Sequence, residues 1–158
     1  MTFQSTCIVT MTLLVSCSRS QSHARAQKLA ERANPIIEKL RAPVGLVLDP
    51  AQADAKAIRS ACLAAIADAA ALSTAGFKDS FVGTGKRTDD SVTPGVDDVL
   101  YTFSMQKDLM CREDQGDGSR DSRCRTWCVE TFTALADAIG RAKEAAAKEG
   151  VTLQTLRP

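Results

Sequence analysis

Histidine and aromatic residues are scarce in this chain. Of its 158 residues one is a histidine, and Phe, Trp and Tyr together make up 4%. The single histidine, His23, lies in a polar, serine-rich stretch, where no packed element would hold it in the geometry that a general base needs. A Ser-His-Asp or Cys-His catalytic site is therefore not expected, and neither is a large pocket lined by aromatic rings.

Net charge and long apolar runs are lacking as well. The 20 Lys and Arg residues balance 19 Asp and Glu residues, which leaves a formal charge of +1. A protein that binds nucleic acid usually carries a strongly basic face, so no nucleic acid is expected as a partner. No apolar run approaches the roughly 20 residues that cross a bilayer as a helix. With 44% hydrophobic and 25% charged residues, the composition is that of one modest globular domain.

Two glycine-containing loops approach the patterns of known ligand sites but lack required residues. Gly83-Thr84-Gly85-Lys86 suggests a phosphate-binding loop, yet Ser80 and Arg87 stand where that motif requires a glycine and a hydroxyl residue. A calcium loop counted with Gly118 as its sixth position places Cys124 at the twelfth, where a Glu is required. Both stretches are interpreted as solvated loops, so no nucleotide, calcium ion or other cofactor is expected.

The remaining candidates for catalysis are paired carboxylates. Asp89-Asp90 and Asp97-Asp98 lie among Gly and Thr residues, which is typical of solvated loop charge rather than of a positioned acid and base. Cys124 and Cys128 are separated by one residue more than the redox C-x-x-C motif allows. No catalytic residue is assigned, and the chain is not expected to be an enzyme. A small envelope enzyme that uses the loop carboxylates is kept as an alternative.

The most informative pattern lies near the amino terminus, where an uncharged apolar run that begins at Cys7 ends at a second cysteine. In order, Leu14, Val15, Ser16 and Cys17 supply the Leu, the branched residue, the small residue and the Cys of a lipobox. The segment therefore resembles the signal of a bacterial lipoprotein. The resemblance covers the signal only, and no named domain family is identified in the rest of the chain.

This resemblance implies that residues 1–16 are removed and that Cys17 carries diacylglyceryl and acyl groups such as palmitate. Because the stretch after Cys17 is polar and rich in serine, residues 17–25 are interpreted as the lipidated cysteine and a tether. At ~0.8 kcal/mol for each buried methylene, two or three acyl chains retain a protein on a membrane without a spanning helix. Ser18, in place of an Asp, implies the periplasmic face of the outer membrane in an enteric-type bacterium. The expected location is the bacterial cell envelope, and the expected partner is another envelope protein.

Cysteine usage gives a second constraint. Of the 6 cysteines, Cys7 leaves with the signal and Cys17 carries lipid. The others are Cys62, Cys111, Cys124 and Cys128. In an oxidising compartment these would form two disulfides, which is the preferred interpretation. If the signal is not used, they are a thiolate metal site or unpaired core residues. Against zinc, the C-x-x-x-C pair lacks the tighter knuckle spacing, and the other two cysteines are remote in the sequence.

Hydrophobic periodicity predicts helices within residues 26–150. The first begins near Ala26 and meets a kink or a restart at Asn34-Pro35, because proline removes a backbone donor. Pro43-Val44-Gly45 is predicted to turn the chain. Asp49-Pro50 supplies a cap and a first-turn proline, so a second helix is predicted to begin at Pro50.

The second helix should end at Gly76, which can adopt a left-handed backbone. A long irregular loop is expected over Phe77–Gly95. The stretch Val96–Cys111 fits either a strand or a helix, and a helix is preferred because a lone strand would leave its backbone donors unpaired. The last helix is predicted over Arg123–Lys148, and residues 151–158 are interpreted as a short tail.

The predicted helices constrain the disulfide pairing. Cys124 and Cys128 lie one turn apart on one helix, where their side chains tilt the same way, so a bond between them is the least favoured. The preferred pairing joins Cys62 to Cys128 and Cys111 to Cys124, and the swapped pairing remains open. Trp127 either shields a disulfide or offers an exposed anchor to a partner.

These features together predict a mainly α fold, a small disulfide-stapled three- or four-helix bundle with a long irregular loop, as one domain over residues 26–150. The predicted function is that of a lipid-anchored cell-envelope protein acting as a binding or structural module.

Overall fold

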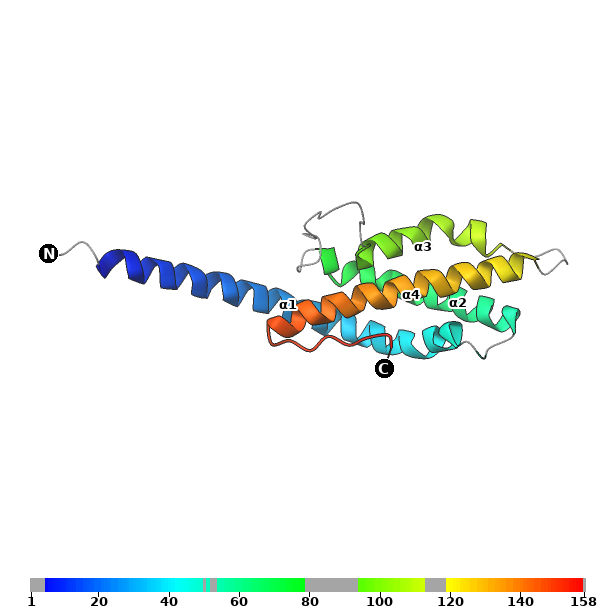
Figure 1. Ribbon diagram of the computed structural model, residues 1–158, viewed down its shortest axis with the longest axis horizontal. Coiled ribbons are helices and arrows are strands. Elements are labelled where there is room, and N and C mark those ends of the chain that lie inside the picture. The colour runs from blue at the N-terminus through cyan, green and yellow to red at the C-terminus, as the bar shows by residue number, and fades with distance from the viewer. Residues whose placement is uncertain (1–4, 50, 52–53, 79–93, 113–118, 158) are drawn as a thin grey trace.

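The computed structural model describes residues 5–49, 51, 54–78, 94–112 and 119–157, with only the backbone described for residues 5–20 and 119–121. In these residues the order of elements is α1 (Ser5–Leu48), α2 (Ala55–Ala69), the 3-10 helix η1 (Ala70–Thr74), α3 (Val96–Met110) and α4 (Ser119–Lys148). Successive α-helices run in alternating directions, and α1 extends beyond the end of the bundle (Figure 1). The predicted disulfide-stapled helical bundle is confirmed.

The first helix, α1, runs through both of its prolines. The chain does not restart at Asn34-Pro35, and the turn predicted at Pro43-Val44-Gly45 is wrong, because helix continues to Leu48. An internal proline costs about 3 kcal/mol or more. Burial of an apolar stripe against α2 and α4 offsets this cost. The stripe consists of Ala26, Leu29, Ala30, Ala33, Ile37, Leu40, Val44 and Val47.

Residues 17–25, which were expected to form a tether, also belong to α1. Two of them contact the residue that follows α4. Ser22 Oγ donates to Glu149 Oε2 at 2.8 Å, and His23 Nδ1 donates to the Glu149 carbonyl oxygen at 2.7 Å. The single histidine of the chain thus helps to fix α1 against the end of α4.

The second helix, α2, begins at Ala55, later than the predicted start at Pro50. Its N-cap is Asp54, whose Oδ1 accepts two backbone N–H groups of the first turn at 2.9 and 3.1 Å. Asp49 caps a local turn instead and accepts the backbone N–H of Ala51 at 2.9 Å. The α-helix ends at Ala69, earlier than the predicted stop at Gly76, and the 3-10 helix η1 continues the helical turns to Thr74. Gly76 then has the left-handed φ, +95°, that was expected of it.

The stretch that fitted either a strand or a helix is helical, as preferred, and forms α3. The backbone N–H of Gly95 donates to Asp98 Oδ2 at 2.8 Å, so one of the paired carboxylates caps this helix. The last helix, α4, ends at Lys148 as predicted and begins a few residues before Arg123. Most of the long loop expected over Phe77–Gly95 lies outside the described residues.

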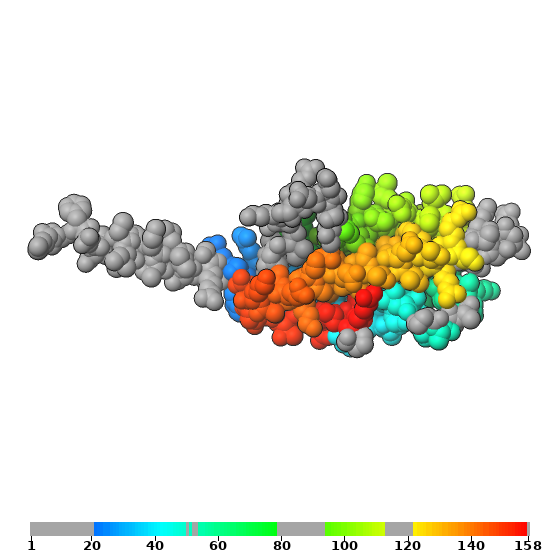
Figure 2. Space-filling model, in the orientation of Figure 1, coloured from blue at the N-terminus to red at the C-terminus, as the bar shows by residue number. Residues whose placement is uncertain are grey.

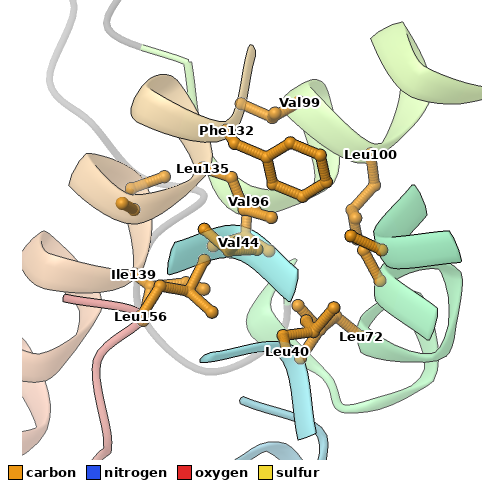
Figure 3. Close-up of a cluster of buried hydrophobic side chains, with 14 of the residues drawn as sticks. Leu40, Val44, Leu72, Val96, Val99, Leu100, Phe132, Leu135, Ile139 and Leu156 are labelled. Atoms are coloured by element: carbon orange, nitrogen blue, oxygen red, sulfur yellow. The ribbon is translucent and has the colours of Figure 1, made fainter. Parts of the chain in front are cut away.

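The hydrophobic core lies where all four helices and the carboxyl-terminal segment meet. Figure 3 shows part of it, made by Leu40, Val44, Leu72, Val96, Val99, Leu100, Phe132, Leu135, Ile139 and Leu156. These side chains come from α1, η1, α3, α4 and the segment after α4. The core therefore joins the whole described bundle into one packed unit.

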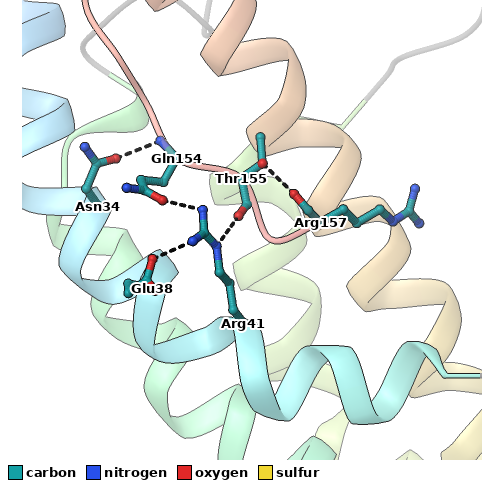
Figure 4. Close-up of polar contacts among 6 residues, drawn as sticks. All are labelled: Asn34, Glu38, Arg41, Gln154, Thr155 and Arg157. Carbon is teal, nitrogen blue, oxygen red and sulfur yellow. Dashed lines mark hydrogen bonds and ion pairs between the residues drawn. The ribbon is translucent and has the colours of Figure 1, made fainter.

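The segment after α4 is not a free tail but packs back along α1. Leu153 and Leu156 are 1% and 4% exposed, so both are core residues. Asn34 Oδ1 accepts the backbone N–H of Gln154 at 2.8 Å, and Arg41 Nε donates to the Thr155 carbonyl oxygen at 2.9 Å (Figure 4). The side chain of Arg41 also donates to Gln154 Oε1.

One stretch of the described chain, Ala55–Thr74, is long and apolar enough to cross a bilayer by length and composition, contrary to the expectation that no stretch approaches this length. It comprises α2 and η1. Core helices of water-soluble proteins meet the same criteria, and Ile58, Cys62, Ala65, Ile66, Ala69 and Leu72 of this stretch are buried in the bundle. The stretch is therefore weak evidence for a membrane span.

Candidate functional site

Four cysteines gather where the end of α3 meets α2 and the first half of α4. Cys62 is bonded to Cys128 and Cys111 to Cys124, with Cα atoms 6.1 and 4.6 Å apart. These are the pairs preferred from the sequence, and the swapped pairing is not the one observed. Three of the cysteines are 0% exposed and Cys111 is 4% exposed, so the cluster is shut off from solvent.

The two disulfides contact each other. The Sγ atom of Cys128 lies 3.8 Å from that of Cys111 and 3.7 Å from that of Cys124. The Sγ atoms of Cys62, Cys111 and Cys128 all lie within 4.8 Å of one another. Two of these cysteines are remote from the others in the sequence, which argued against a common thiolate site, but the fold brings all four together. We refer to them as the cysteine cluster.

A cation and an aromatic pair border the cysteine cluster. Arg59 Nε and Nη2 donate to the carbonyl oxygen of Cys111 at 3.2 and 2.9 Å. Trp127 is 6% exposed, donates from Nε1 to Gln106 Oε1 at 3.2 Å, and meets Phe103 edge to face with centroids 5.9 Å apart. The interpretation of Trp127 as an exposed anchor is therefore wrong, and its ring belongs to the core beside Cys128.

A second feature was missed from the sequence, an exposed apolar stripe on α3. Tyr101, Met105 and Leu109 are 66%, 64% and 75% exposed, whereas Leu46, the other exposed large hydrophobic residue of the described chain, is 37% exposed. Residues four apart lie on one face of a helix, so the three side chains form a continuous row, the α3 stripe. Their spacing was visible in the sequence, but spacing alone does not distinguish a face toward solvent from a face toward the core.

Hollows lie on both sides of α3. One, of about 420 Å³, is lined by Met105, Asp108, Leu109, Met110, Arg112 and Arg123. The other, of about 340 Å³, separates α3 from α2 and includes Leu63, Ile66, Leu100 and Phe103 in its apolar lining. In the space-filling view α3 occupies an outer edge of the bundle (Figure 2). The α3 stripe thus lies on an outer, uneven surface of the kind that packs against another helix.

Other residues singled out from the sequence are not brought to this region. Cys17 lies within α1, but its side chain is outside the described residues, so its lipidation stays a prediction. The stretch 83–86, Asp89-Asp90 and Gly118 are also outside the described residues. Asp98 is described, and it caps α3.

Comparison of the chain with protein-family models, with curated proteins and with solved structures finds no match. The features of the chain that bear on function are the residue pattern Leu14 to Cys17, the cysteine cluster and the α3 stripe.

Proposed function

We propose that the protein is a lipid-anchored component of the bacterial cell envelope that acts as a binding or structural module. The observation that carries the proposal is the coincidence of a lipobox, Leu14 to Cys17, with two buried disulfides. A lipoprotein signal sends the chain to a compartment in which disulfides persist, and a reducing cytosol would oppose both bonds. The two features support the same location independently.

The helical structure of α1 gives this anchor a defined geometry. Cys17 would be the first residue of the mature chain, and Ala26 is the first buried residue among the described side chains. Nine residues of α-helix span roughly 14 Å. Since α1 includes both positions, a helix rather than a loose tether would connect the acyl chains to the bundle. Ser18 after the lipidated cysteine supports the periplasmic face of the outer membrane.

Intact mass spectrometry of protein recovered from native membranes tests this proposal. We expect a chain that begins at Cys17, carries acyl groups, and gains alkyl labels on its four remaining thiols only after reduction. Cys17→Ser should abolish acylation and move the protein to the soluble fraction. Cys7→Ser is the matched control, because it changes a cysteine that the signal peptidase would remove.

Two outcomes would overturn the proposal. One is a wild-type mass that begins at Met1 with thiols that are alkylated without reduction. The other is membrane association and processing of Cys17→Ser equal to those of the wild type.

One observation favours a second function, a thiolate metal centre in the reduced chain. Zinc bound by four thiolates at about 2.3 Å has sulfurs about 3.8 Å apart. Cys128 Sγ already lies 3.8 and 3.7 Å from the sulfurs of Cys111 and Cys124. A dithiol reductant would convert the two disulfides to four thiols, and one Zn²⁺ would then replace four protons. The guanidinium of Arg59 would partly balance the resulting double negative charge.

Cobalt titration of the reduced full-length chain without oxygen tests this second function. We expect the absorption of tetrahedral cobalt thiolate at one Co²⁺ per chain, its loss on addition of Zn²⁺, and its loss in Cys128→Ser. Cys17→Ser serves as the control and should titrate like the wild type. Absence of the absorption, or its persistence in Cys128→Ser, would exclude a metal centre in the cysteine cluster.

A further inference from the structure

A set of exposed residues, four on α3 and Arg112 just after it, is spaced symmetrically about Met105 in the sequence. Tyr101 and Leu109 each lie four residues from it, and Asp98 and Arg112 each lie seven residues from it, and all five are exposed. At 3.6 residues per turn, Asp98, Tyr101, Met105 and Leu109 fall within roughly 40° of the direction of Met105, so these four share one face of α3, which ends at Met110. Arg112 follows the last turn of α3 and lines the same hollow as Met105 and Leu109.

A face with this symmetry is complementary to itself when two helices pack antiparallel. A two-fold axis at Met105 places the two Met105 side chains together and sets each Tyr101 opposite Leu109 of the second copy. The same axis brings each Asp98 opposite Arg112 of the second copy. Apolar contacts then occupy the centre and opposite charges meet at both ends, which is the arrangement of an isologous interface.

We propose that the α3 stripe is the interface of a homodimer, in which the α3 helices of two copies pack antiparallel about a two-fold axis at Met105. The inference goes beyond the proposed function, and it does not depend on the lipid anchor. Charge argues for a second copy over another protein. An unrelated partner would not require the acidic and basic residues to lie at equal distances from the centre of the apolar row.

The hollow beside the stripe fits this arrangement. Tyr101 of the second copy would lie opposite Leu109, at the edge of the hollow of about 420 Å³. The ring of Tyr101 can cover the apolar wall formed by Met105 and Leu109, while its hydroxyl reaches the polar rim, where Asp108 and Arg123 lie. Each copy contributes one tyrosine and one hollow, so the contact is made twice.

The dimer should be weak. One pair of helices about four turns long buries much less than the roughly 1,600 Å² of a standard stable interface. Its apolar row contains three large side chains, and its ion pairs are exposed to solvent. We therefore expect a monomer–dimer equilibrium that crosslinking can trap.

Single cysteine substitutions in the full-length chain test the geometry. A disulfide requires Cα atoms within about 7 Å. Met105→Cys lies on the proposed axis, so oxidation should give a covalent dimer. Tyr101→Cys should not give one, because the two copies of this position are displaced by roughly 12 Å along the helices. Tyr101→Cys combined with Leu109→Cys should restore the dimer, since these positions face each other. Leu46→Cys is the control for random collision.

Three results would overturn the proposal. If Met105→Cys gives no more covalent dimer than Leu46→Cys, the proposed contact between the two α3 helices at Met105 does not form. Tyr101→Cys that crosslinks as well as Met105→Cys would indicate parallel or unspecific pairing. A product that contains a different protein would assign the α3 stripe to that partner instead.

Charge reversal gives an independent test in the Met105→Cys background. Arg112→Asp would set like charges opposite each other at both ends and should lower the crosslinked fraction by on the order of tenfold. Adding Asp98→Lys should restore it, although this change also removes the helix cap. Lys28→Glu on α1 is the control reversal and should have no effect. If the crosslinked fraction of the variant with both Arg112→Asp and Asp98→Lys stays low while its helix content is unchanged, the proposed pairing of Asp98 with Arg112 is wrong.

Discussion

At the scale of single residues, Trp127 shows how one side chain connects the core to the cysteine cluster. Its ring packs edge to face on Phe103 with centroids 5.9 Å apart, and Phe103 in turn lies 4.8 Å from the ring of Phe132. Its indole nitrogen reaches outward to Gln106. The residue therefore follows the usual pattern of a buried tryptophan, with an apolar body in the core and a polar edge that finds a partner.

Trp127→Ala should destabilise the fold by about 3–5 kcal/mol, the range for removal of a large buried aromatic side chain. Trp127→Phe should cost less than Trp127→Ala, because an aromatic ring remains against Phe103 and Gln106, the partner of the lost indole N–H, is exposed to water. Urea unfolding followed by circular dichroism would measure both changes. Equal stability of the alanine variant and the wild type would show that the ring does not belong to the core.

At the scale of elements, the start of α2 depends on a cap that the sequence pattern did not identify. Asp54→Ala should lower stability by about 1 kcal/mol, since two first-turn N–H groups lose their acceptor. Asp49→Ala should have a smaller effect, because it removes one bond in a turn outside the helix. Thermal unfolding of the two variants and of Asp54→Asn, which keeps a capping oxygen, would test this order. If Asp49→Ala lowers stability more than Asp54→Ala does, Asp49 is the cap of the helix, as the sequence predicted.

The helices themselves were largely predictable, and the errors have a common physical cause. Periodicity identified α4, because amphipathic spacing is a local property. The pattern of α3 fitted a strand as well, and the helix was preferred because a lone strand would leave its backbone donors unpaired. Pro35 and Pro43 were given too much weight, since local rules do not include the burial of an apolar stripe against two other helices. Leu153 and Leu156 could not be assigned to the core, because two apolar residues in a short segment have no measurable period.

The candidate site was predictable only in part. Helix geometry disfavoured a bond between Cys124 and Cys128 but left two pairings open, and the structure decides between them. The contact between the two disulfides depends on how α2, α3 and α4 pack. The α3 stripe was hidden for a similar reason. An exposed row and a buried row have the same spacing, and tertiary structure decides which of them faces water.

At the scale of the whole molecule, the two disulfides constrain the unfolded chain unequally. Cys62 and Cys128 are 66 residues apart, and Cys111 and Cys124 are 13 residues apart. Loop-closure entropy predicts roughly 4.4 and 3.0 kcal/mol of stabilisation respectively. Replacing the first pair with alanine should therefore destabilise the protein by about 1.5 kcal/mol more than replacing the second. Urea unfolding of the two alanine variants would measure this difference. If the variant without the first disulfide unfolds at the same or a higher urea concentration than the variant without the second, packing rather than chain entropy sets the contribution of each bond.

The lipid anchor and the α3 interface together predict how a dimer would lie on a membrane. In an antiparallel α3 pair the two α1 helices point in opposite directions, because α1 and α3 run the same way within one copy (Figure 1). If the helix axes stand perpendicular to the membrane (upright), the two anchors enter different membranes. If the helix axes lie parallel to the membrane (flat), both anchors enter the same membrane. Confinement to one membrane then raises the effective concentration of one copy near the other and favours the weak dimer.

We expect the flat arrangement, since anchoring in one layer favours pairing within it. In vesicles that carry acylated Met105→Cys, the crosslinked fraction should stay constant when vesicles are diluted at a fixed protein-to-lipid ratio, and the vesicles should not cluster. In the Cys17→Ser background the same fraction should fall with dilution, because free copies meet only in solution. Crosslinking that falls with vesicle dilution and accompanies clustering would instead show that upright copies bridge two membranes.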